Sequence, residues 1–393
     1  MRHAYNRDGD HARGMQMDSR MTRQSLVILF LVFILAAPCR AELAAGLAAY
    51  NAGDYAKARS ELEPAAARGD PAAEKKLAHM YAIGLGGSRD DAQAIGWWQK
   101  AAQSGDAEAQ WDLAEEYTAG SRIKRDYNQA VAWCRKSAEQ GYGPAQLNLA
   151  NFYSGGYDGI PADQAQAVYW LHLAADQGQR GAAGFLGSKY AAGLGVKKDD
   201  AQAVYWWRKE AEKGDSSAQL SLAASYRFGR GVDQDYSQAL AWYKKAASMG
   251  GEAQLGLGDM YYGGLGTPRD FDRAFALYSG LAKYGSWQAQ SHLGAMYERG
   301  DGVPKNLVIA CAWYRLKPVS TVADRAVTDY IRRTATPEVL EQMNKAIAEN
   351  ELAKKNNIER VSSLLTAEQL TRAQDLANAW KPGQMIADDS AKQ

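Results

Sequence analysis

The sequence predicts an all-α solenoid of helix-turn-helix repeats, each about 36 residues long. Three observations predict this fold: a tyrosine recurs at a near-constant spacing, a glycine follows each tyrosine three residues later, and a large apolar residue follows sixteen or seventeen residues later. The tyrosines are Tyr81, Tyr117, Tyr153, Tyr190, Tyr226, Tyr261 and Tyr297. Their separations are 36, 36, 37, 36, 35 and 36 residues. Such a period is typical of stacked supersecondary units and does not arise from one globular core.

Residues 216–251 show how one unit is built. Small and apolar residues up to Tyr226 recur at the spacing of one helical face, which predicts a first helix. Gly229 then ends this helix, because glycine adopts the left-handed cap conformation without a Cβ penalty. Asp235 stands where its side chain can cap a second helix, and Gly250 ends that helix. The unit is therefore helix, turn, helix, turn.

Two kinds of residue recur in register in the predicted second helix. An aspartate precedes it in most units: Asp90, Asp126, Asp163, Asp199, Asp235 and Asp270. This recurrence predicts helix capping and not catalysis. Eight of the eleven tryptophans occupy two adjacent positions within the helix: Trp97, Trp98, Trp133, Trp170, Trp206, Trp207, Trp242 and Trp313. We interpret them first as core residues and only second as binding residues.

The end units differ from the internal ones, as expected for a solenoid whose terminal units have only one neighbour. At the front, Gly53-Asp54 replaces the long turn. At the back, Thr336–Glu338 and the capping box Thr366–Gln369 mark two helix starts. The predicted organisation is a signal peptide at 1–41, a degenerate capping repeat at 42–70, seven repeats at 71–318, a C-terminal helical cap at 319–381 and a disordered tail at 382–393.

The N-terminal segment has the features of a secretory signal peptide. A 12-residue apolar run, Leu26–Ala37, follows basic Arg20 and Arg23 and precedes small residues. We predict cleavage after Ala41, which places the mature protein in the periplasm or outside the cell with no integral membrane segment. Two alternatives stay open: translation can start at Met21 instead of at the first residue, and the run can be retained as an anchor. The run is short for an anchor, because a membrane-spanning helix needs about 20 residues.

Charge and cysteine content constrain the partners and cross-links. The formal net charge is +1, and removal of residues 1–41, which carry six arginines and three aspartates, makes it −2. No repeat face carries a lysine or arginine stripe, so we expect no nucleic-acid partner. The mature chain keeps Cys134 and Cys311, whose separation by five repeats argues against a disulfide. We expect both to be buried as small apolar side chains.

No motif in the sequence predicts catalysis, a cofactor or a metal. Gly-x-Gly turns such as Gly193–Gly195 begin like a dinucleotide fingerprint, but the sixth residue is never glycine and each turn follows a predicted helix. After signal removal the histidines are His79, His172 and His292, each in a separate repeat and without a second ligand at metal-binding spacing. Nucleophile elbows, zinc-peptidase helices and calcium loops are absent. We therefore expect a protein that is not an enzyme.

The order of alanine, Leu-Gly, tyrosine, Gly-x-Gly-Val, aspartate and Trp-Tyr resembles the Sel-one-like repeat, a relative of the tetratricopeptide repeat. It is clearest in Leu186–Val196 and Ala239–Gly250. The resemblance implies an α/α superhelix and a role like that of exported bacterial members, which act as adaptors or regulators in envelope polysaccharide, motility, signalling or host-contact systems. Two units depart from the pattern, with Gly120–Arg122 in place of Gly-x-Gly and Leu277 in place of tryptophan. A family subgroup credited with binding or hydrolysing penicillin-like compounds carries cysteine pairs that this chain lacks, so that activity is disfavoured.

We predict a periplasmic or secreted scaffold that binds another protein or an extended peptide along the concave face lined by the first helices. Residues two positions before and after the core leucine of each first helix should face this groove. In the first three units they are Lys75, His79, Trp111, Glu115, Leu147 and Asn151. The middle units offer small or apolar groups there: Gly184, Ser188, Leu220 and Ala224. Trp111 is the best hot-spot candidate, because aromatic anchors dominate binding energy; its alternative role is to fill an irregularity beside the departing turn.

Two classes of function remain in view. The scaffold could serve cell-envelope polysaccharide machinery, as the family resemblance implies. The alternative is an envelope enzyme or a carbohydrate- or peptidoglycan-binding module, which an aromatic content of 10% favours. Against this alternative, packing between helices requires most of the tryptophans.

Overall fold

The structure is a computed structural model that describes residues 41–248, 250–316 and 337–386. The regular secondary structure of these residues is helical. The predicted all-α fold of paired helices, with further helices at the C-terminal end, is therefore confirmed. The predicted signal peptide lies outside the described residues except for Ala41. Within the described ranges, no helix has the length and apolar character that crossing a membrane requires.

Each repeat consists of a first and a second helix joined by a turn. The first helices are α3 (Pro71–Ile83), α5 (Ala107–Ala119), α7 (Gly143–Gly155), α9 (Ala182–Ala192), α11 (Ser216–Phe228), α13 (Gly251–Gly263) and α15 (Trp287–Arg299). The second helices are α4 (Asp91–Gln103), α6 (Tyr127–Glu139), α8 (Gln164–Asp176), α10 (Asp200–Glu212), α12 (Tyr236–Ala246), α14 (Phe271–Ala282) and α16 (Leu307–Arg315). Residues 41–51 and α2 (Tyr55–Ala67) precede them, and α18 (Pro337–Ser362) and α19 (Ala367–Ala379) follow them.

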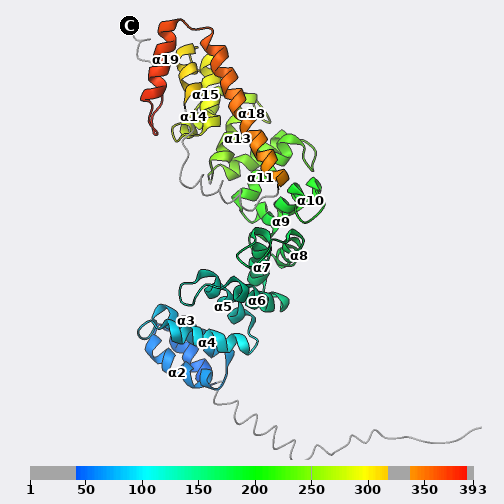
Figure 1. Ribbon diagram of the computed structural model, residues 1–393, viewed down its shortest axis with the longest axis vertical. Helices are drawn as coiled ribbons and strands as arrows, with labels where there is room; N and C mark the ends of the chain where they lie inside the picture. Colours follow the sequence, from blue (N-terminus) through cyan, green and yellow to red (C-terminus); the bar gives the residue numbers. More distant parts are fainter. Residues whose placement is uncertain (1–40, 249, 317–336, 387–393) are drawn as a thin grey trace, which may run out of the picture. The chain divides into compact units, whose positions relative to one another are not determined.

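The chain forms two compact units, of which unit 1 ends at Gln140 and unit 2 begins at Gly141. In unit 1, the helices from α2 to α6 pack each against the next in sequence. In unit 2, the helices from α7 to α16 do the same, and α18 and α19 pack on α16. Figure 1 shows this pairing of neighbouring helices inside each unit. Each repeat therefore builds its core with its immediate neighbours.

The core of each repeat lies between its first and second helices. One leucine of every first helix is buried: Leu77, Leu113, Leu149, Leu186, Leu222, Leu257 and Leu293. Among the tryptophans of the second helices, Trp98, Trp170, Trp206 and Trp313 are buried, and Trp97, Trp133, Trp207 and Trp242 are partly buried. Their interpretation as core residues is confirmed. Cys134 and Cys311 are both buried as well.

The recurring aspartates cap the second helices as predicted. Asp199 precedes α10, and its carboxylate accepts a hydrogen bond from the backbone N–H of Gln202 at 2.9 Å. The same geometry recurs at Asp90, Asp126, Asp163, Asp235 and Asp270. In the last repeat Asn306 takes this position and accepts from the N–H of Ile309. Each cap satisfies an N–H that has no partner inside its helix.

The second glycine of the Gly-x-Gly turns lies against the preceding repeat. Gly195 has a φ of 74°, and a Cβ at this position would overlap the carbonyl of Gln164, the first residue of α8. Any larger residue would push the two repeats apart. In the repeat that has Gly120–Arg122 instead of Gly-x-Gly, Arg122 takes the place of the second glycine. Its Nε lies 3.3 Å from the carboxylate of Asp91, the first residue of α4. An ion pair there replaces a close backbone approach.

A glutamine three residues before the buried leucine joins successive helices. The side-chain amide of Gln110 donates a hydrogen bond to the carbonyl of Ala102, near the end of the preceding second helix, at 3.1 Å. Gln219, Gln254 and Gln290 make the equivalent contact. In α3 this position is taken by Glu74, which is 3% exposed. The four glutamines therefore tie the start of a first helix to the end of the preceding second helix, where the last carbonyls have no intrahelical partner.

The C-terminal helices cover the last repeat. Val361 of α18 and Ala373 of α19 are buried in one cluster with Cys311 of α16. Helix α19 begins with the predicted capping box, in which the Thr366 hydroxyl accepts a hydrogen bond from the N–H of Gln369. This packing gives α16 a neighbour where no further repeat follows.

Beyond the end of α19, the chain still packs against earlier helices of unit 2. The N–H of Gly383 donates to the carbonyl of Lys283 at 2.6 Å, and Ile386 is 5% exposed. The segment predicted as a tail, 382–393, therefore begins with residues that pack, because Ile386 buries an apolar side chain in the core cluster of α12 to α16. Residues 387–393 lie outside the described residues, as do residues 319–336 of the predicted cap.

Candidate partner-binding face

We define the first-helix face as the side chains two residues before and two residues after the buried leucine of each first helix. The residue before is partly exposed at Lys75, Trp111, Leu147, Gly184, Leu220, Leu255 and Ser291. The residue after is exposed at His79, Glu115, Asn151 and Ser188, and partly exposed at Ala224, Asp259 and Ala295. Helical spacing turns these positions away from the core on either side of the leucine. The six binding residues predicted from sequence all reach the surface, and their binding role stays a prediction.

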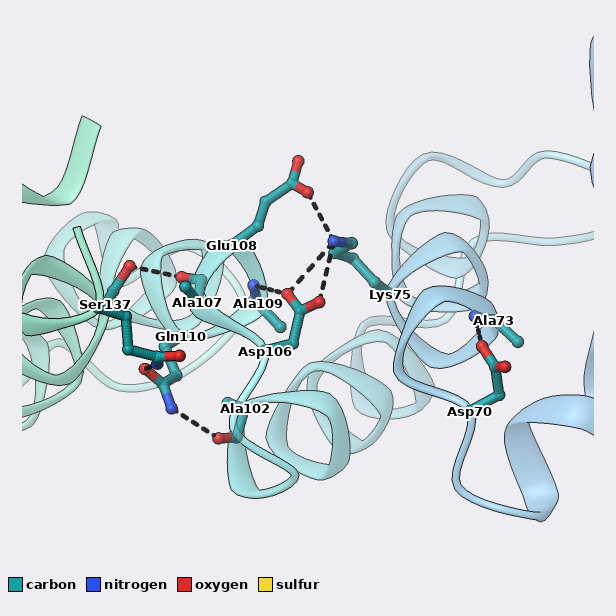
Figure 2. Close-up of polar contacts among 11 residues, drawn as sticks. Asp70, Ala73, Lys75, Ala102, Asp106, Ala107, Glu108, Ala109, Gln110 and Ser137 are labelled. Atoms are coloured by element: carbon teal, nitrogen blue, oxygen red, sulfur yellow. Dashed lines mark hydrogen bonds and ion pairs between the residues drawn. The ribbon is translucent and has the colours of Figure 1, made fainter. Parts of the chain in front are cut away.

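Lys75 has an intramolecular role in unit 1. Its Nζ lies 3.2 Å from both carboxylate oxygens of Asp106 and 2.6 Å from Oε2 of Glu108, as Figure 2 shows. Asp106 also caps α5 by accepting from the N–H of Ala109 at 2.7 Å. Burial acts to lower the pKa of Lys75, but the hydrogen bonds and charges of the two carboxylates outweigh it, so the pKa is raised. Lys75 thus holds α3 to the start of α5, and a partner would have to compete for its ammonium group.

A titratable carboxyl neighbours Trp111 on α5. Burial, reinforced by the negative charge of Glu108, raises the pKa of Asp112 to about 7. The charge next to this part of the face therefore changes near neutral pH. His79 and Glu115 are exposed on the same face. The raised pKa of Asp112 depends mainly on burial in the folded chain, so a local sequence pattern does not predict it.

The structure divides the predicted binding residues between the two units. Lys75, His79, Trp111 and Glu115 belong to unit 1, whereas Leu147 and Asn151 belong to α7 of unit 2. Each group therefore presents its own part of the first-helix face.

Two neighbouring hollows open on the first-helix face of unit 2. Hollow A, about 160 Å³, lies between α9 and α11 and is lined by Gly181, Gly184, Phe185, Ser188, Trp207, Asp215, Ser217, Ala218 and Ser221. Hollow B, about 250 Å³, lies between α11 and α13 and is lined by Ser216, Ser217, Leu220, Ala246, Gly250, Gly251, Glu252 and Ala253. Ser217 borders both hollows. Gly184, Ser188 and Leu220 are positions that the sequence places on the face as small or apolar groups.

Small residues leave hollow A open, and buried groups hold its walls. Gly181 precedes α9 and has no side chain that could cap this helix. Its N–H donates a hydrogen bond to Oε1 of Glu210 at 2.7 Å, and Glu210 is fully buried. The indole of Trp207 packs so closely on Gly187 that a Cβ there would overlap the ring. Phe185 stands at the rim with 53% of its surface exposed. The sequence pattern shows the glycines but not that their absent side chains combine into a hollow.

The charged side chains that line the two hollows are carboxylates. Asp215 lines hollow A, where it also caps α11 by accepting from the N–H of Ala218 at 2.7 Å. Glu252 lines hollow B and is exposed. The remaining lining is apolar, glycine or serine. The lining therefore combines apolar groups and serine with two carboxylates, of which one caps α11.

The histidines occupy three separate settings. His79 is exposed, Nε2 of His172 lies 3.0 Å from the hydroxyl of Tyr190, and Nε2 of His292 lies 3.3 Å from the carboxylate of Asp259. Burial lowers the pKa of both His172 and His292. In the part of the chain that the structure describes, no three histidine, cysteine or acidic side chains gather in a way that could hold a metal ion.

Comparison with protein families identifies the repeats. Seven segments match the model of the Sel1 repeat: 71–106, 107–142, 143–179, 182–215, 216–251, 251–279 and 287–316. The chain belongs to the Sel1 repeat family. This is the Sel-one-like family that the sequence motifs resemble, so the recognition from sequence is confirmed.

Solved structures of other Sel1 repeat proteins resemble the chain. A Sel1 repeat protein from Oxalobacter formigenes is 33% identical, with a TM-score of 0.51, and the match covers 61% of this chain and 95% of that one. A protective antigen present in uropathogenic Escherichia coli strains, which displays an SLR fold, is 25% identical, with a TM-score of 0.43 and coverage of 87% and 84%. Comparison with curated protein sequences gives no match. Sel1 repeat proteins typically act as protein-interaction scaffolds and are usually non-catalytic, so the family suggests protein binding.

Proposed function

We propose that this Sel1 repeat protein is an exported scaffold of the bacterial envelope that binds a partner protein or an extended segment of one through its first-helix face. The observation that carries the proposal is the pair of adjoining hollows between α9, α11 and α13. At about 160 and 250 Å³ they are smaller than the ligand clefts of about 300–1,000 Å³ that enclose small molecules. Hollows of this size suit single side chains of a protein ligand.

Export is the second part of the proposal. It is supported by the apolar run Leu26–Ala37 behind two arginines, which has the composition of a signal peptide. The intact mass of the processed protein tests it, with Glu42 expected as the first residue. Recovery of the protein from the membrane fraction with the run retained would instead make it an anchored scaffold.

Photo-crosslinking tests the binding face. A photo-reactive amino acid is placed at Ser188 on the first-helix face or at Ser217 on the border of the two hollows, and at the exposed Ala241 of α12 as the control position. We expect cross-links to one defined protein from the first two positions and none from the third, with the partner identified by mass spectrometry and confirmed by reciprocal capture. Cross-links from Ala241 alone would move the binding surface to the second helices.

One observation favours a second candidate, a carbohydrate- or peptidoglycan-binding role. Tyr169 of α8 and Tyr205 of α10 occupy the same register and are 54% and 48% exposed. Each ring meets the following tryptophan edge-on, with centroids 5.0 Å apart and an interplanar angle of 80°. Core packing requires no tyrosine at these exposed positions, and exposed aromatic rings can stack on ligands. Co-sedimentation with purified peptidoglycan that is lost in the Tyr169→Ala, Tyr205→Ala double variant would support this role over the scaffold.

A further inference from the structure

We propose that two copies of this chain pair through the first half of α18. We define the α18 arm as residues 337–349, which precede the part of the helix that is anchored to the last repeat. In the pair, the two arms lie antiparallel and bury Leu340, Met343 and Ile347 of both chains between them. This self-association is separate from the proposed function, because it uses α18 and not the first-helix face.

The second half of α18 is anchored to the last repeat. Asn350 lines a small hollow together with residues of α15 and α16. The ammonium group of Lys354 donates a hydrogen bond at 2.7 Å to the carbonyl of the residue after α16, and Arg360 donates to the carboxylate of Glu298 on α15 at 2.9 Å. Val361 is fully buried beside α16. Because α18 is one continuous helix, these contacts also fix the position of the α18 arm.

The α18 arm continues the face by which the helix is anchored. Leu340, Met343 and Ile347 follow one another at spacings of three and four residues. Asn350 and Lys354 of the anchored half extend the same series. Such a series lies on one face of a helix and has the spacing of a coiled-coil seam. The seam is polar at Asn350 and Lys354, where it meets the last repeat, and it is apolar in the arm, beyond the anchor.

The apolar side chains of the arm stay accessible within one chain. Ile347 is 48% exposed, and Leu340 and Met343 are partly exposed. Val361, which lies on the same face in the anchored half, is fully buried. The arm cannot turn back onto the last repeat while α18 stays unbroken from Pro337 to Ser362. An accessible apolar stripe of this kind marks a contact surface for another molecule.

The distribution of charge favours an identical arm as the occupant. Glu341, Lys345 and Glu349 are exposed, and helical spacing places them on the side of the arm that faces away from the seam. Asn344 and Ala346, which lie beside the seam, are exposed and carry no charge. In coiled coils, the charges beside the seam decide which partner is accepted. Two identical arms can therefore pair without repulsion between like charges.

Antiparallel pairing fits the way in which α18 is attached. Each arm joins the rest of unit 2 at its C-terminal end, so parallel arms would bring two copies of the last repeat against each other. Antiparallel arms keep the two copies at opposite ends and make the contact two-fold symmetric. The arm is half of a 26-residue helix and so is about 20 Å long. A contact of this length is smaller than a standard interface, so we expect the pair to dissociate on dilution.

Size-exclusion chromatography with light scattering tests the pairing on the intact purified protein. We expect a mass of two chains at high concentration that falls toward one chain on dilution. Met343→Glu combined with Ile347→Glu places carboxylates in the seam and should give the mass of one chain at every concentration. Gln342→Glu combined with Ala348→Glu is the matched control, because it adds the same charge at exposed positions away from the seam and should leave the mass unchanged. Circular dichroism confirms that both variants are folded.

Mixing two single variants tests the antiparallel arrangement. In this arrangement Met343 of one arm faces Ile347 of the other, so Met343→Glu in one chain meets Ile347→Lys in the second chain. We expect each variant alone to give the mass of one chain and the mixture to give the mass of two, because the opposite charges face each other only between unlike chains.

Three outcomes would contradict the pairing. A mass of one chain at every concentration for the unaltered protein would overturn it, as would a mass of two chains for the folded Met343→Glu, Ile347→Glu variant. Failure of the mixture to restore the pair would overturn the antiparallel arrangement. Photo-crosslinking at Ser188 still reports on the partner of the first-helix face in each case, so the proposed function is judged separately.

Discussion

The hydroxyl of Tyr278 donates a hydrogen bond to the carboxylate of Asp259 at 2.7 Å. The same oxygen lies 3.3 Å from Nε2 of His292, and the other oxygen accepts from the guanidinium of Arg227 at 2.9 Å. The imidazole of His292 stacks on the Tyr278 ring, with centroids 4.5 Å apart. One carboxylate therefore joins α11, α13, α14 and α15, and so ties three successive repeats of unit 2 together.

Tyr278→Phe is expected to lower the free energy of unfolding by about 1–3 kcal/mol, because it removes a donor from a largely buried charged acceptor. Tyr278 itself is fully buried, so water cannot replace the lost hydroxyl freely. Urea denaturation followed by circular dichroism measures the change. Tyr284→Phe is the control, since Tyr284 is 77% exposed and its change should stay within about 0.5 kcal/mol. Equal stability of the two variants would show that the hydroxyl does not support the network.

Acidification should weaken the same network. Burial lowers the pKa of His292 from its ordinary 6.5, and Arg227 lowers it further, whereas Asp259 acts to raise it. Because the folded pKa is depressed, the stabilisation is present above about 6.5 and is lost as the pH falls below that value through the folded pKa. Unfolding midpoints measured between pH 7.5 and 5 should fall for the wild type and fall less steeply for His292→Gln. His172, whose pKa burial also lowers, should account for part of the remaining slope.

Glu74 should respond to pH in the opposite direction. Burial raises its pKa, an effect that Lys100 opposes and Asp70 reinforces. A raised folded pKa means that its favourable contribution is present below the ordinary value of 4.5 and is lost as the pH rises through the folded pKa. Glu74→Gln supplies the amide that Gln110, Gln219, Gln254 and Gln290 use at this position, so we expect it to stabilise unit 1 by about 1 kcal/mol at neutral pH.

Thermal and urea unfolding measure the effect of Glu74→Gln. Glu139→Gln, at an exposed position of the same unit, provides the matched control and should change little. A destabilised Glu74→Gln variant would mean that the carboxylate makes a favourable contact that an amide cannot replace.

Trp206→Ala should lower the free energy of unfolding by about 3–5 kcal/mol, as large truncations in a core do. The side chain is 5% exposed, and the His172 ring meets it at a centroid distance of 5.5 Å. Trp242→Ala should cost less than the same change at Trp206, because Trp242 is only partly buried and its outer face carries the ammonium group of Lys245 at 4.0 Å. Denaturant titrations of both variants rank the two positions, and a wild-type midpoint for Trp206→Ala would contradict its core role.

Trp111→Ala combined with Glu115→Ala is expected to weaken capture of the partner at least about tenfold, because aromatic anchors carry much of the energy of an interface. Trp111 is partly buried and Glu115 is exposed on α5, so the melting temperature of the variant is measured first and capture is compared for folded protein. Pull-down of the partner identified by crosslinking, with Ser217→Trp tested in parallel, measures the effect. Undiminished capture by the folded double variant, together with loss in Ser217→Trp, would confine the site to the hollows of unit 2.

The sequence by itself determined the repeat and its helices. Asp199 caps α10 with its own carboxylate, and Gly193 ends α9 in the left-handed conformation, so each acts on residues next to it in the chain. Helical spacing placed Leu186 in the core and Ser188 on the surface for the same local reason. Stacking then followed from the period, because a unit of this size cannot bury both of its faces alone.

Tertiary structure decided the polar joints and the hollows. Asp259 meets side chains from three other helices, and Glu210 of the neighbouring α10 replaces the missing cap of α9. Hollow A is lined by Gly184 of α9, Trp207 of α10 and Ser221 of α11, and so by three helices that meet only in the folded chain. Side chains on different helices make these contacts only when the helices are placed at a particular distance and rotation. A local sequence pattern carries neither quantity, and packing fixes both.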